Sequence, residues 1–181
     1  MGRRGEIADA GVRLIARRGI RALTHLSVDS EAALPRGSTS YYARTRRDLI
    51  ALVVDRLSEG SRADVEGLII PPELSREEAA QLVGEVLDRM TGREDAQTAR
   101  FALLFELRDD ELRAALTRQA PVRAVLIAEA EKLLRAIGVT DPEAHAPDLV
   151  GIVDALLMYR AAQAGPVDAA RVLRTYLDGL A

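Results

Sequence analysis

The stretch that decides the fold is residues 34–49, which read LPRGSTSYYARTRRDL. Pro35 disfavours helical backbone at Leu34 but suits the opening of a helix, so we expect a turn at Leu34 and a short helix from Pro35 to Tyr42. This helix has almost no apolar side chains of its own. Because so short and polar a helix is not stable alone, its neighbours must hold it while its outer face lies in solvent or against a partner.

A second helix is expected directly before this turn. Apolar residues repeat at helical spacing over residues 7–18, and Gly19 ends that first pattern. The next helix begins after Thr24 or Ser27, either of which could cap it, and reaches about Ala33. Two short helices joined by a proline turn predict a helix-turn-helix, whose second helix could enter the major groove of DNA.

The remainder of the chain has longer helical patterns. Ser75 and Glu78 form a capping box, and Pro121 should kink or break the pattern around it. β-Branched residues are scattered rather than alternating, which argues against strands. We therefore predict an all-α fold, with a three-helix head at residues 1–46 and a helical ligand-binding and dimerisation body at residues 47–181. The expected helices of the body cover residues 45–70, 76–92, 95–107, 109–138, 148–163 and 166–180.

Composition excludes several classes of chemistry. The 181 residues are 48% hydrophobic and include no Cys and only two His, His25 and His145. Thiolate and multi-histidine metal sites are therefore excluded, and we expect no metal and no cofactor. No apolar run approaches the length of a membrane span, and the start of the chain does not read as a signal peptide, so a cytoplasmic protein is expected.

Charge is divided unevenly along the chain. Residues 1–50 hold ten Arg against five acidic residues, whereas the other 131 residues hold fifteen basic and twenty-three acidic residues. A basic segment on an acidic protein suggests contact with a polyanion, although chance clustering would give the same counts.

The short polar helix supplies most of the candidate DNA contacts. Its first turn should reach base edges, the bare N–H groups around Gly37 should offer a phosphate site, and the following arginines should flank the DNA backbone. One of the two tyrosines could instead be a packing residue, and Arg47 could pair with Asp48 or Asp55. The candidates are Thr24, Ser27, Arg36, Gly37, Ser38, Thr39, Ser40, Tyr41, Tyr42, Arg44, Arg46 and Arg47.

Residues 7–57 resemble the N-terminal domain of the TetR/AcrR family of bacterial transcriptional repressors. The resemblance rests on the first-helix pattern, the RG that ends it, ALT before the second helix, RGS before the third and RTRRDL before the fourth. It implies a homodimer that binds a double-stranded DNA operator until an unknown small-molecule effector binds the C-terminal helices. The two reading heads then move apart.

The sequence departs from the family pattern within the helix-turn-helix. Ala33 stands where the family usually has the turn glycine, Pro35 replaces a usual Ser or Thr, and Ala43 replaces a packing Phe. We therefore expect a loosely anchored third helix. Ser40 occupies the place of a usual phosphate-binding Tyr, so Tyr41 or Tyr42 would take that role.

The body offers a pocket and an interface. The apolar stretch RFALLFEL suggests a pocket wall, with plain core as the alternative, and Arg108 or His145 could supply a polar anchor. The pocket candidates are Met90, Phe101, Leu104, Phe105, Arg108, Met158 and Tyr159. The resemblance implies that the last two helices form the dimer interface, with Leu149, Ile152, Val153, Leu156, Leu173 and Leu177 as candidates.

Two other functions remain open at this stage. An all-α binding module or enzyme could carry a basic head incidentally, and a regulator could work without a small ligand. Asp109, Asp110 and Glu111 read as an acidic helix start rather than as a catalytic carboxylate pair, because acidic residues favour that end of a helix. No residue is predicted to be catalytic.

Overall fold

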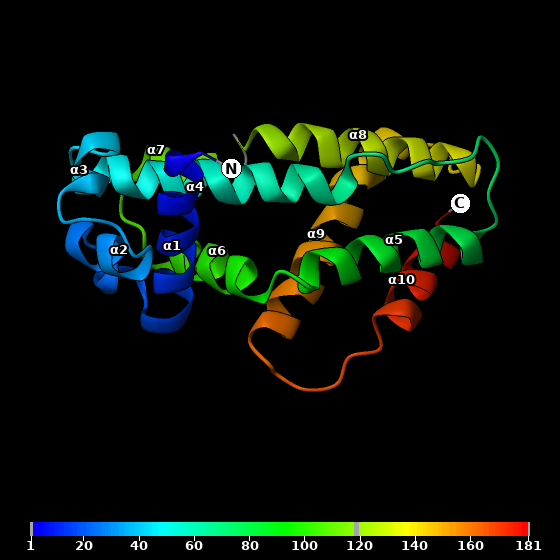
Figure 1. Ribbon diagram of the computed structural model, residues 1–181. Coiled ribbons are helices and arrows are strands. Elements are labelled where there is room, and N and C mark those ends of the chain that lie inside the picture. The colour runs from blue at the N-terminus through cyan, green and yellow to red at the C-terminus, as the bar shows by residue number, and fades with distance from the viewer. Residues whose placement is uncertain (1, 118–119, 181) are drawn as a thin grey trace. The chain divides into compact units, whose positions relative to one another are not determined.

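The computed structural model describes residues 2–117 and 120–180, and within them it contains helices and no strand (Figure 1). The predicted all-α fold is confirmed. The chain divides into two compact units. Unit 1 comprises Met1–Ser61 and Glu94–Pro121, and unit 2 comprises Arg62–Arg93 and Val122–Ala181. The head expected at residues 1–46 thus lies in unit 1, together with later segments of the chain.

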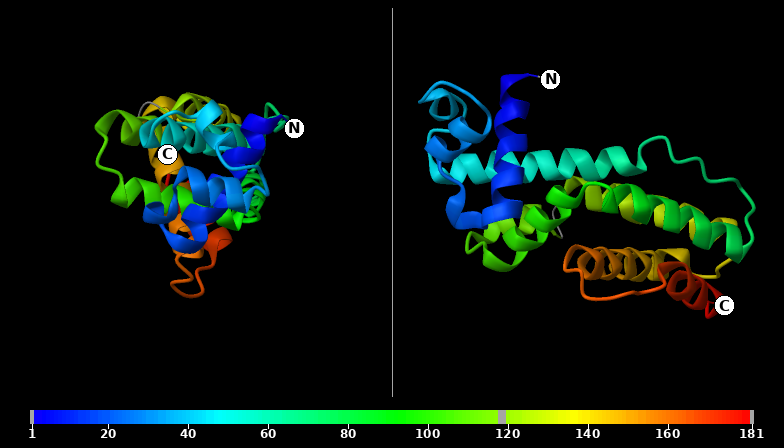
Figure 2. Two further views of the ribbon diagram at one scale, coloured as in Figure 1. Left: turned by 60° about the vertical axis from the view of Figure 1, so that its left-hand side comes forward. Right: turned by 60° about the horizontal axis from the view of Figure 1, so that its bottom comes forward.

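Unit 1 is built around the first helix. Its elements are α1 (Arg3–Arg18), the 3-10 turn η1 (Ile20–Ala22), α2 (His25–Glu31), α3 (Ser38–Tyr42), most of α4 (Arg46–Val65), α6 (Glu94–Glu106) and α7 (Asp110–Ala115). α1 packs against α6 and crosses α4 (Figure 2). A Cβ on Gly11 would lie 2.5 Å from Val53, so only glycine permits this close approach. Ile7, Ile15 and Leu103 are fully buried at the centre of this core.

Unit 2 holds α5 (Arg76–Thr91), α8 (Pro121–Ala136, with Pro121 at the unit boundary), α9 (Pro142–Ala161) and α10 (Ala169–Asp178). The predicted capping box of Ser75 and Glu78 opens α5. α5 packs against α9 and α10. Arg76 donates a hydrogen bond to the Leu177 carbonyl, and Arg160 donates to the Asp88 carboxylate at 2.7 Å. These polar contacts fix the helix ends around an apolar interior.

Several helix boundaries differ from the sequence expectation, including the end of α4 at Val65 rather than near Ile70 and the start of α10 at Ala169 rather than at residue 166. α3 begins at Ser38 rather than Pro35, because Gly37 has a left-handed φ of 91° that no α-helix accommodates. The pattern over residues 109–138 is broken into α7 and α8 at Pro121, where the sequence left kink and break open. α9 begins at Pro142 and carries Pro147 inside it.

The described helices include none that is long and apolar enough to cross a membrane.

Candidate nucleic-acid interface and pocket

The turn between α2 and α3 is shaped by two residues with positive φ. Thr24 caps α2 by accepting a hydrogen bond from the Ser27 N–H at 3.1 Å. Ala33 follows α2 with a φ of 53°, a conformation that favours glycine. Gly37 then precedes α3 with a φ of 91°. The chain therefore tolerates some strain at Ala33, and other contacts must stabilise the turn.

A buried carboxylate supplies those contacts. Asp29 on α2 is only 2% exposed. It accepts hydrogen bonds from the Gly37 N–H at 2.7 Å, the Thr39 N–H at 2.8 Å and the Thr39 hydroxyl at 2.6 Å. Three donors satisfy the carboxylate, and the carboxylate in turn satisfies N–H groups that no helical carbonyl reaches. Asp29 therefore fastens the start of α3 to α2.

The surroundings keep Asp29 ionised. Burial by itself would raise the pKa of Asp29, but the hydrogen bonds from Thr39 and Gly37 and the nearby His25 outweigh it and lower the pKa below 3.8. The negative charge therefore stays in place at neutral pH and faces the positive end of α3.

The other end of α3 is held as well. His25 Nε2 lies 2.7 Å from the Ala43 carbonyl oxygen, and because a carbonyl only accepts, Nε2 carries the hydrogen. Ala43 itself is buried. Arg46, at the start of α4, donates to the carbonyls of Leu23 and Ile20, the latter at 2.7 Å. Contrary to the expectation of loose anchoring, α3 is held at both ends.

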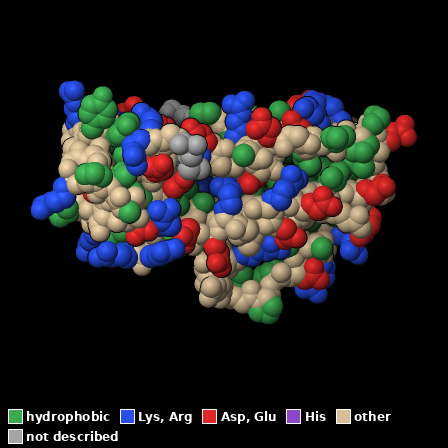
Figure 3. Space-filling model, in the orientation of Figure 1, with side chains coloured by type: hydrophobic (Ala, Val, Ile, Leu, Met, Phe, Trp, Pro, Cys, Tyr) green, Lys and Arg blue, Asp and Glu red, His purple; other side chains and the backbone are tan. Residues whose placement is uncertain are grey.

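The outward side of this motif is cationic and aromatic. Arg36, Ser40 and Arg44 are exposed, and within the described residues neither arginine forms an ion pair. Tyr41 is 83% exposed, and its ring meets that of Tyr42 edge to face, with centroids 5.1 Å apart. Figure 3 shows Lys and Arg side chains on the visible face of the part that holds α1 to α3. This surface, hereafter the α3 surface, consists of Arg36, Ser40, Tyr41, Tyr42 and Arg44.

Arg47 is occupied elsewhere in unit 1. Its Nε lies 2.8 Å from Asp109 Oδ2, and its Nη2 lies 2.5 Å from Glu111 Oε2. Hydrogen bonding to Asp109, and then the charges of Asp109 and Glu111, raise the pKa of Arg47. The pKa of Asp109 is lowered by the Leu112 N–H and by Arg47. These three acidic and basic groups link the first turn of α4 to the start of α7.

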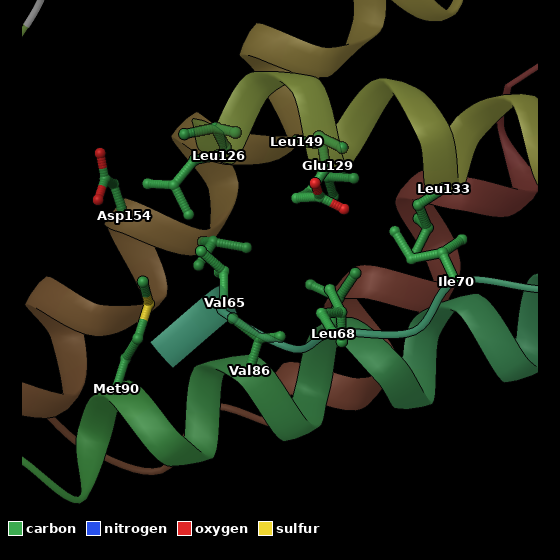
Figure 4. A pocket seen from close by; sticks show the side chains of 14 residues that line it. Val65, Leu68, Ile70, Val86, Met90, Leu126, Glu129, Leu133, Leu149 and Asp154 are labelled. Atoms are coloured by element: carbon green, nitrogen blue, oxygen red, sulfur yellow. The ribbon is translucent and has the colours of Figure 1, made fainter. Parts of the chain in front are cut away.

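Unit 2 contains an apolar pocket (Figure 4). Its cavity volume is about 70 Å³. The only charged side chains among its lining residues are the carboxylates of Glu129 on α8 and Asp154 on α9. The lining comprises Val65, Leu68, Ile70, Val83, Val86, Met90, Leu126, Glu129, Ala130, Leu133, Leu149, Val150, Val153 and Asp154.

Comparison with known proteins assigns the family. Residues 74–181 match the family model described as "Tetracyclin repressor-like, C-terminal domain". The chain belongs to the TetR family. A search of the curated proteins gave no match.

Solved structures agree over almost the whole chain. A transcriptional regulator from Rhodococcus sp. Rha1 superposes with a TM-score of 0.78 at 15% identity, covering 99% of this chain and 96% of that one. A TetR family member from Streptomyces coelicolor A3 has a TM-score of 0.71 at 28% identity, covering 98% and 97%. The multidrug binding protein EbrR, complexed with ethidium, has a TM-score of 0.67 at 27% identity, with the same coverage. This TetR-family protein is a DNA-binding transcriptional regulator and not an enzyme.

The structure sorts the predicted DNA contacts of this TetR-family regulator into two groups. Arg36, Gly37, Ser40, Tyr41, Tyr42 and Arg44 are exposed, as is Thr24, and Ser27 and Ser38 are half-buried. One prediction needs correction, because Thr39 is fully buried with its hydroxyl on Asp29. Arg46 and Arg47 are exposed and stay predicted DNA contacts, although Arg46 donates to carbonyls within unit 1 and Arg47 pairs with Asp109 and Glu111 rather than Asp48 or Asp55.

The predicted phosphate site at the start of α3 is also corrected. The Gly37 and Thr39 N–H groups donate to Asp29, and the Ser38 N–H donates to the Pro35 carbonyl at 3.1 Å. The hydroxyl of Ser38 donates to the same carbonyl at 2.7 Å. Since the protein itself satisfies these three N–H groups, they are not available to a phosphate.

Of the predicted pocket residues, only Met90 lines the pocket. Phe101, Leu104, Phe105 and Arg108 belong to unit 1, where Phe105 is 70% exposed and Arg108 is exposed, so α6 is not buried on all sides. Met158 and Tyr159 lie exposed on α9. The side chain of His145 is outside the lining, and its carbonyl accepts the Tyr176 hydroxyl at 3.2 Å. Burial, and then the charge of Asp148, raise the pKa of Tyr176.

The predicted interface leucines are likewise reassigned. Leu149, Leu156, Leu173 and Leu177 are buried within unit 2, where they form core rather than a free surface. Ile152 and Val153 are half-buried, and Val153 lines the pocket. The apolar stripes of α9 and α10 were read correctly, but their partner is α5 of the same chain.

Sequence reasoning missed the residues that organise both sites. Asp29 was overlooked because an acidic residue in a basic segment reads as solvated surface, although its position eight residues before Gly37 spans the turn. Glu129 and Asp154 were overlooked because a charged residue on an amphipathic helix normally faces solvent.

Proposed function

We propose that the protein is a homodimeric repressor that binds an operator through its α3 surface and releases it when a small molecule enters the unit 2 pocket. The observation that carries the proposal is that some arginines around α3 have partners within unit 1 while others do not. Arg46 and Arg47 are paired inside unit 1, while Arg36 and Arg44 are exposed without ion pairs among the described residues. As a regulator of bacterial type, the protein would act in the cytoplasm, where its DNA lies.

The α3 surface has the chemistry that duplex DNA requires. Free arginines can contact phosphates or guanine edges, and the two tyrosine hydroxyls can donate to phosphate oxygens. Because Asp29 and His25 fix both ends of α3, these side chains project from a braced support. Preorganisation of this kind reduces the entropy lost on binding. Thr24, the N-cap of α2, and Ser27 on α2 would contribute contacts to the DNA backbone beside the α3 surface.

The outer face of α9 supports dimerisation. Gly151, Ala155, Met158 and Ala162 are all exposed, and their spacing of four, three and four residues places them on one side of the helix. Burying them against a second copy would remove this apolar stripe from water. Small residues would let two helices approach closely. The proposed interface therefore replaces the inward leucines by this small-residue face.

The pocket supports regulation by a small molecule. A cavity of about 70 Å³ holds only a few water molecules, since one water needs about 10–15 Å³. Ligands of drug size occupy sites of about 300–1,000 Å³, so such an effector must widen the pocket. Val65, the last residue of α4, lines it, and the same helix begins at Arg46 after α3. An effector that favours a widened pocket would thereby shift the population away from the DNA-binding form. EbrR has been solved with both ethidium and malachite green, which supports small-molecule binding here.

The test is selection of DNA by the purified protein from random duplexes. We expect enrichment of a palindromic sequence, since a twofold dimer presents two copies of α3. Affinity for the selected duplex should fall steeply with salt, because counterions are released when arginines meet phosphates. Recovery of no preferred sequence, or of a sequence without dyad symmetry, would contradict the proposal.

A further inference from the structure

We infer that the effector pocket selects an apolar cation, held by Glu129 with Asp154 as a second negative charge. This inference rests on the proposed function of the pocket and specifies the chemistry of its ligand. It starts from the charge of the wall. The lining includes two carboxylates and no Lys, Arg or His, while its other members are apolar.

Glu129 has an oxygen to offer. Its Oε1 accepts from Lys132 Nζ at 2.6 Å, one turn along α8, whereas no described residue bonds to Oε2. Figure 4 shows the Glu129 carboxylate on the side of α8 that faces α5. The side chain is 21% exposed, and that of Lys132 is 58% exposed. An ion pair with so exposed a lysine is weak, so it would not prevent the carboxylate from meeting a ligand cation.

Asp154 provides a second charge on another wall. It lies on α9, and its Oδ2 is 3.7 Å from Arg123 Nη1. Arg123 is thus one partner of this residue, which is also part of the pocket lining. The lining itself adds no basic side chain to these two carboxylates, which lie on different helices in a mostly apolar cavity where charges are poorly screened. An anionic ligand would be repelled there, and a neutral one would gain nothing from either carboxylate.

The rest of the wall selects for apolar bulk. Leu126 and Leu133 from α8, Val86 and Met90 from α5, and Leu68 from the connecting segment line the pocket around Glu129, and Asp154 lies at its edge (Figure 4). Met90 is flexible and polarizable, so it can adapt to an aromatic ring. A hydrophilic cation would lose its hydration without compensation. The ligand class that satisfies both features is an apolar, preferably aromatic, organic cation.

The test compares charged and uncharged ligands on matched variants of the full-length protein. Ethidium is the cationic probe and phenanthridine, its uncharged parent ring system, is the neutral probe. Glu129→Gln removes the charge but retains size. Glu131→Gln is the control, because Glu131 lies on α8 outside the pocket lining, is 25% exposed and also pairs with a neighbour, Arg135. Binding is measured by titration calorimetry without DNA, since ethidium itself binds DNA.

We expect Glu129→Gln to weaken ethidium binding about tenfold or more, the size of a lost charged hydrogen bond, and to leave phenanthridine binding unchanged. Glu131→Gln should match the wild type with both probes. Equal affinity of the wild type for the two probes, equal behaviour of the two variants, or no ethidium binding at all would overturn the inference. Operator binding by the same samples distinguishes failure of the ligand-class inference from failure of the proposed function. If it persists, only the ligand class is wrong, whereas its absence from the wild type would refute the proposed function.

Discussion

The turn of unit 1 and the pocket of unit 2 each contain a carboxylate away from bulk solvent, but the two carboxylates have different effects. In the turn, the carboxylate of Asp29 is buried and receives three hydrogen bonds, so it fixes one conformation. In the pocket, Glu129 lies in an apolar wall with one oxygen unbonded by the described residues. A satisfied buried charge makes a structure rigid, whereas a partly satisfied one beside a cavity leaves something for a ligand to complete. The contrast separates the part proposed to bind DNA from the part proposed to respond to an effector.

The largest expected effect concerns the core of unit 2. Leu173→Ala should destabilise the protein by about 2–5 kcal/mol, because Leu173 is fully buried and its loss leaves a cavity. Ala155→Arg, on the exposed face of α9, should leave the fold intact but yield monomers. Denaturant unfolding measures the first effect and analytical ultracentrifugation the second. A dimer that survives Ala155→Arg would place the interface elsewhere.

Removal of the Asp29 clamp, the set of hydrogen bonds from Gly37 and Thr39 to the Asp29 carboxylate, should have the next largest effect. Asp29→Ala should cost about 2–4 kcal/mol of stability, since it leaves buried N–H donors without acceptors, and should abolish measurable operator selection. Asp55→Ala removes an exposed carboxylate that pairs weakly with Arg4, and it serves as the control. Thermal unfolding and DNA binding check both variants. Similar losses in the two would show that Asp29 contributes no more than general surface charge.

The same clamp predicts a pH dependence. The pKa of Asp29 is below its unfolded value of 3.8 in the folded protein. A lowered pKa means that the carboxylate stabilises the fold at pH values above 3.8, and that this stabilisation is lost as the pH falls through the folded-state pKa. The free energy of unfolding, measured between about pH 5 and about pH 2, should fall more steeply with decreasing pH in the wild type than in a variant without this carboxylate. In Asp29→Asn, the free energy of unfolding should depend less on pH over the same acid range.

The exposed arginines should have a smaller, selective effect. Arg36→Ala should reduce discrimination between operator and random duplex by about 1–3 kcal/mol if Arg36 contacts a base. Arg44→Ala should weaken binding to operator and to random duplex about equally. It should also reduce the slope of log affinity against log salt concentration by about one. Arg47→Ala should instead alter stability, because Arg47 pairs with Asp109 and Glu111. Equal weakening on both duplexes by Arg36→Ala would assign that residue to phosphate.

The smallest effect concerns the cavity. Ala130→Leu should fill part of it, raising stability by about 1 kcal/mol through added apolar burial while abolishing the response to the effector. Ala128→Leu, exposed on the same helix, is the control. Operator binding measured with and without ethidium distinguishes them. A full effector response in the filled variant would exclude this cavity as the site.

Much of unit 1 was predictable because its signals are local. Gly19 ends α1, the Thr24 side chain caps α2 and Pro35 lies in the turn before α3, so the order of α1 to α3 follows from sequence. The partners of Thr39, Arg46 and Arg47 were not predictable, since they lie on segments distant in the chain or across the turn. An arginine in a basic stretch looks the same whether it meets phosphate or a carbonyl.

Unit 2 was predictable as helices but not as a site. Periodicity identified the apolar faces of α9 and α10, yet Leu149 and Leu173 could have served a second copy as well as α5. Whether an apolar residue fills a core or lines a cavity depends on small differences in packing between several helices. No pattern within one helix records that difference, which is why only Met90 was predicted correctly among the lining residues.

The way α3 is fastened has a consequence for the evolution of specificity. The hydrogen bonds of Asp29, His25, Ser38 and Thr39 that hold its two ends do not use the side chains of Arg36, Ser40 or Tyr41. Those outward positions can therefore mutate toward a new target sequence without weakening the support on which they stand. Substitutions at these positions, in evolution or in design, could change which operator sequence is recognised while the contacts that hold α3 stay the same.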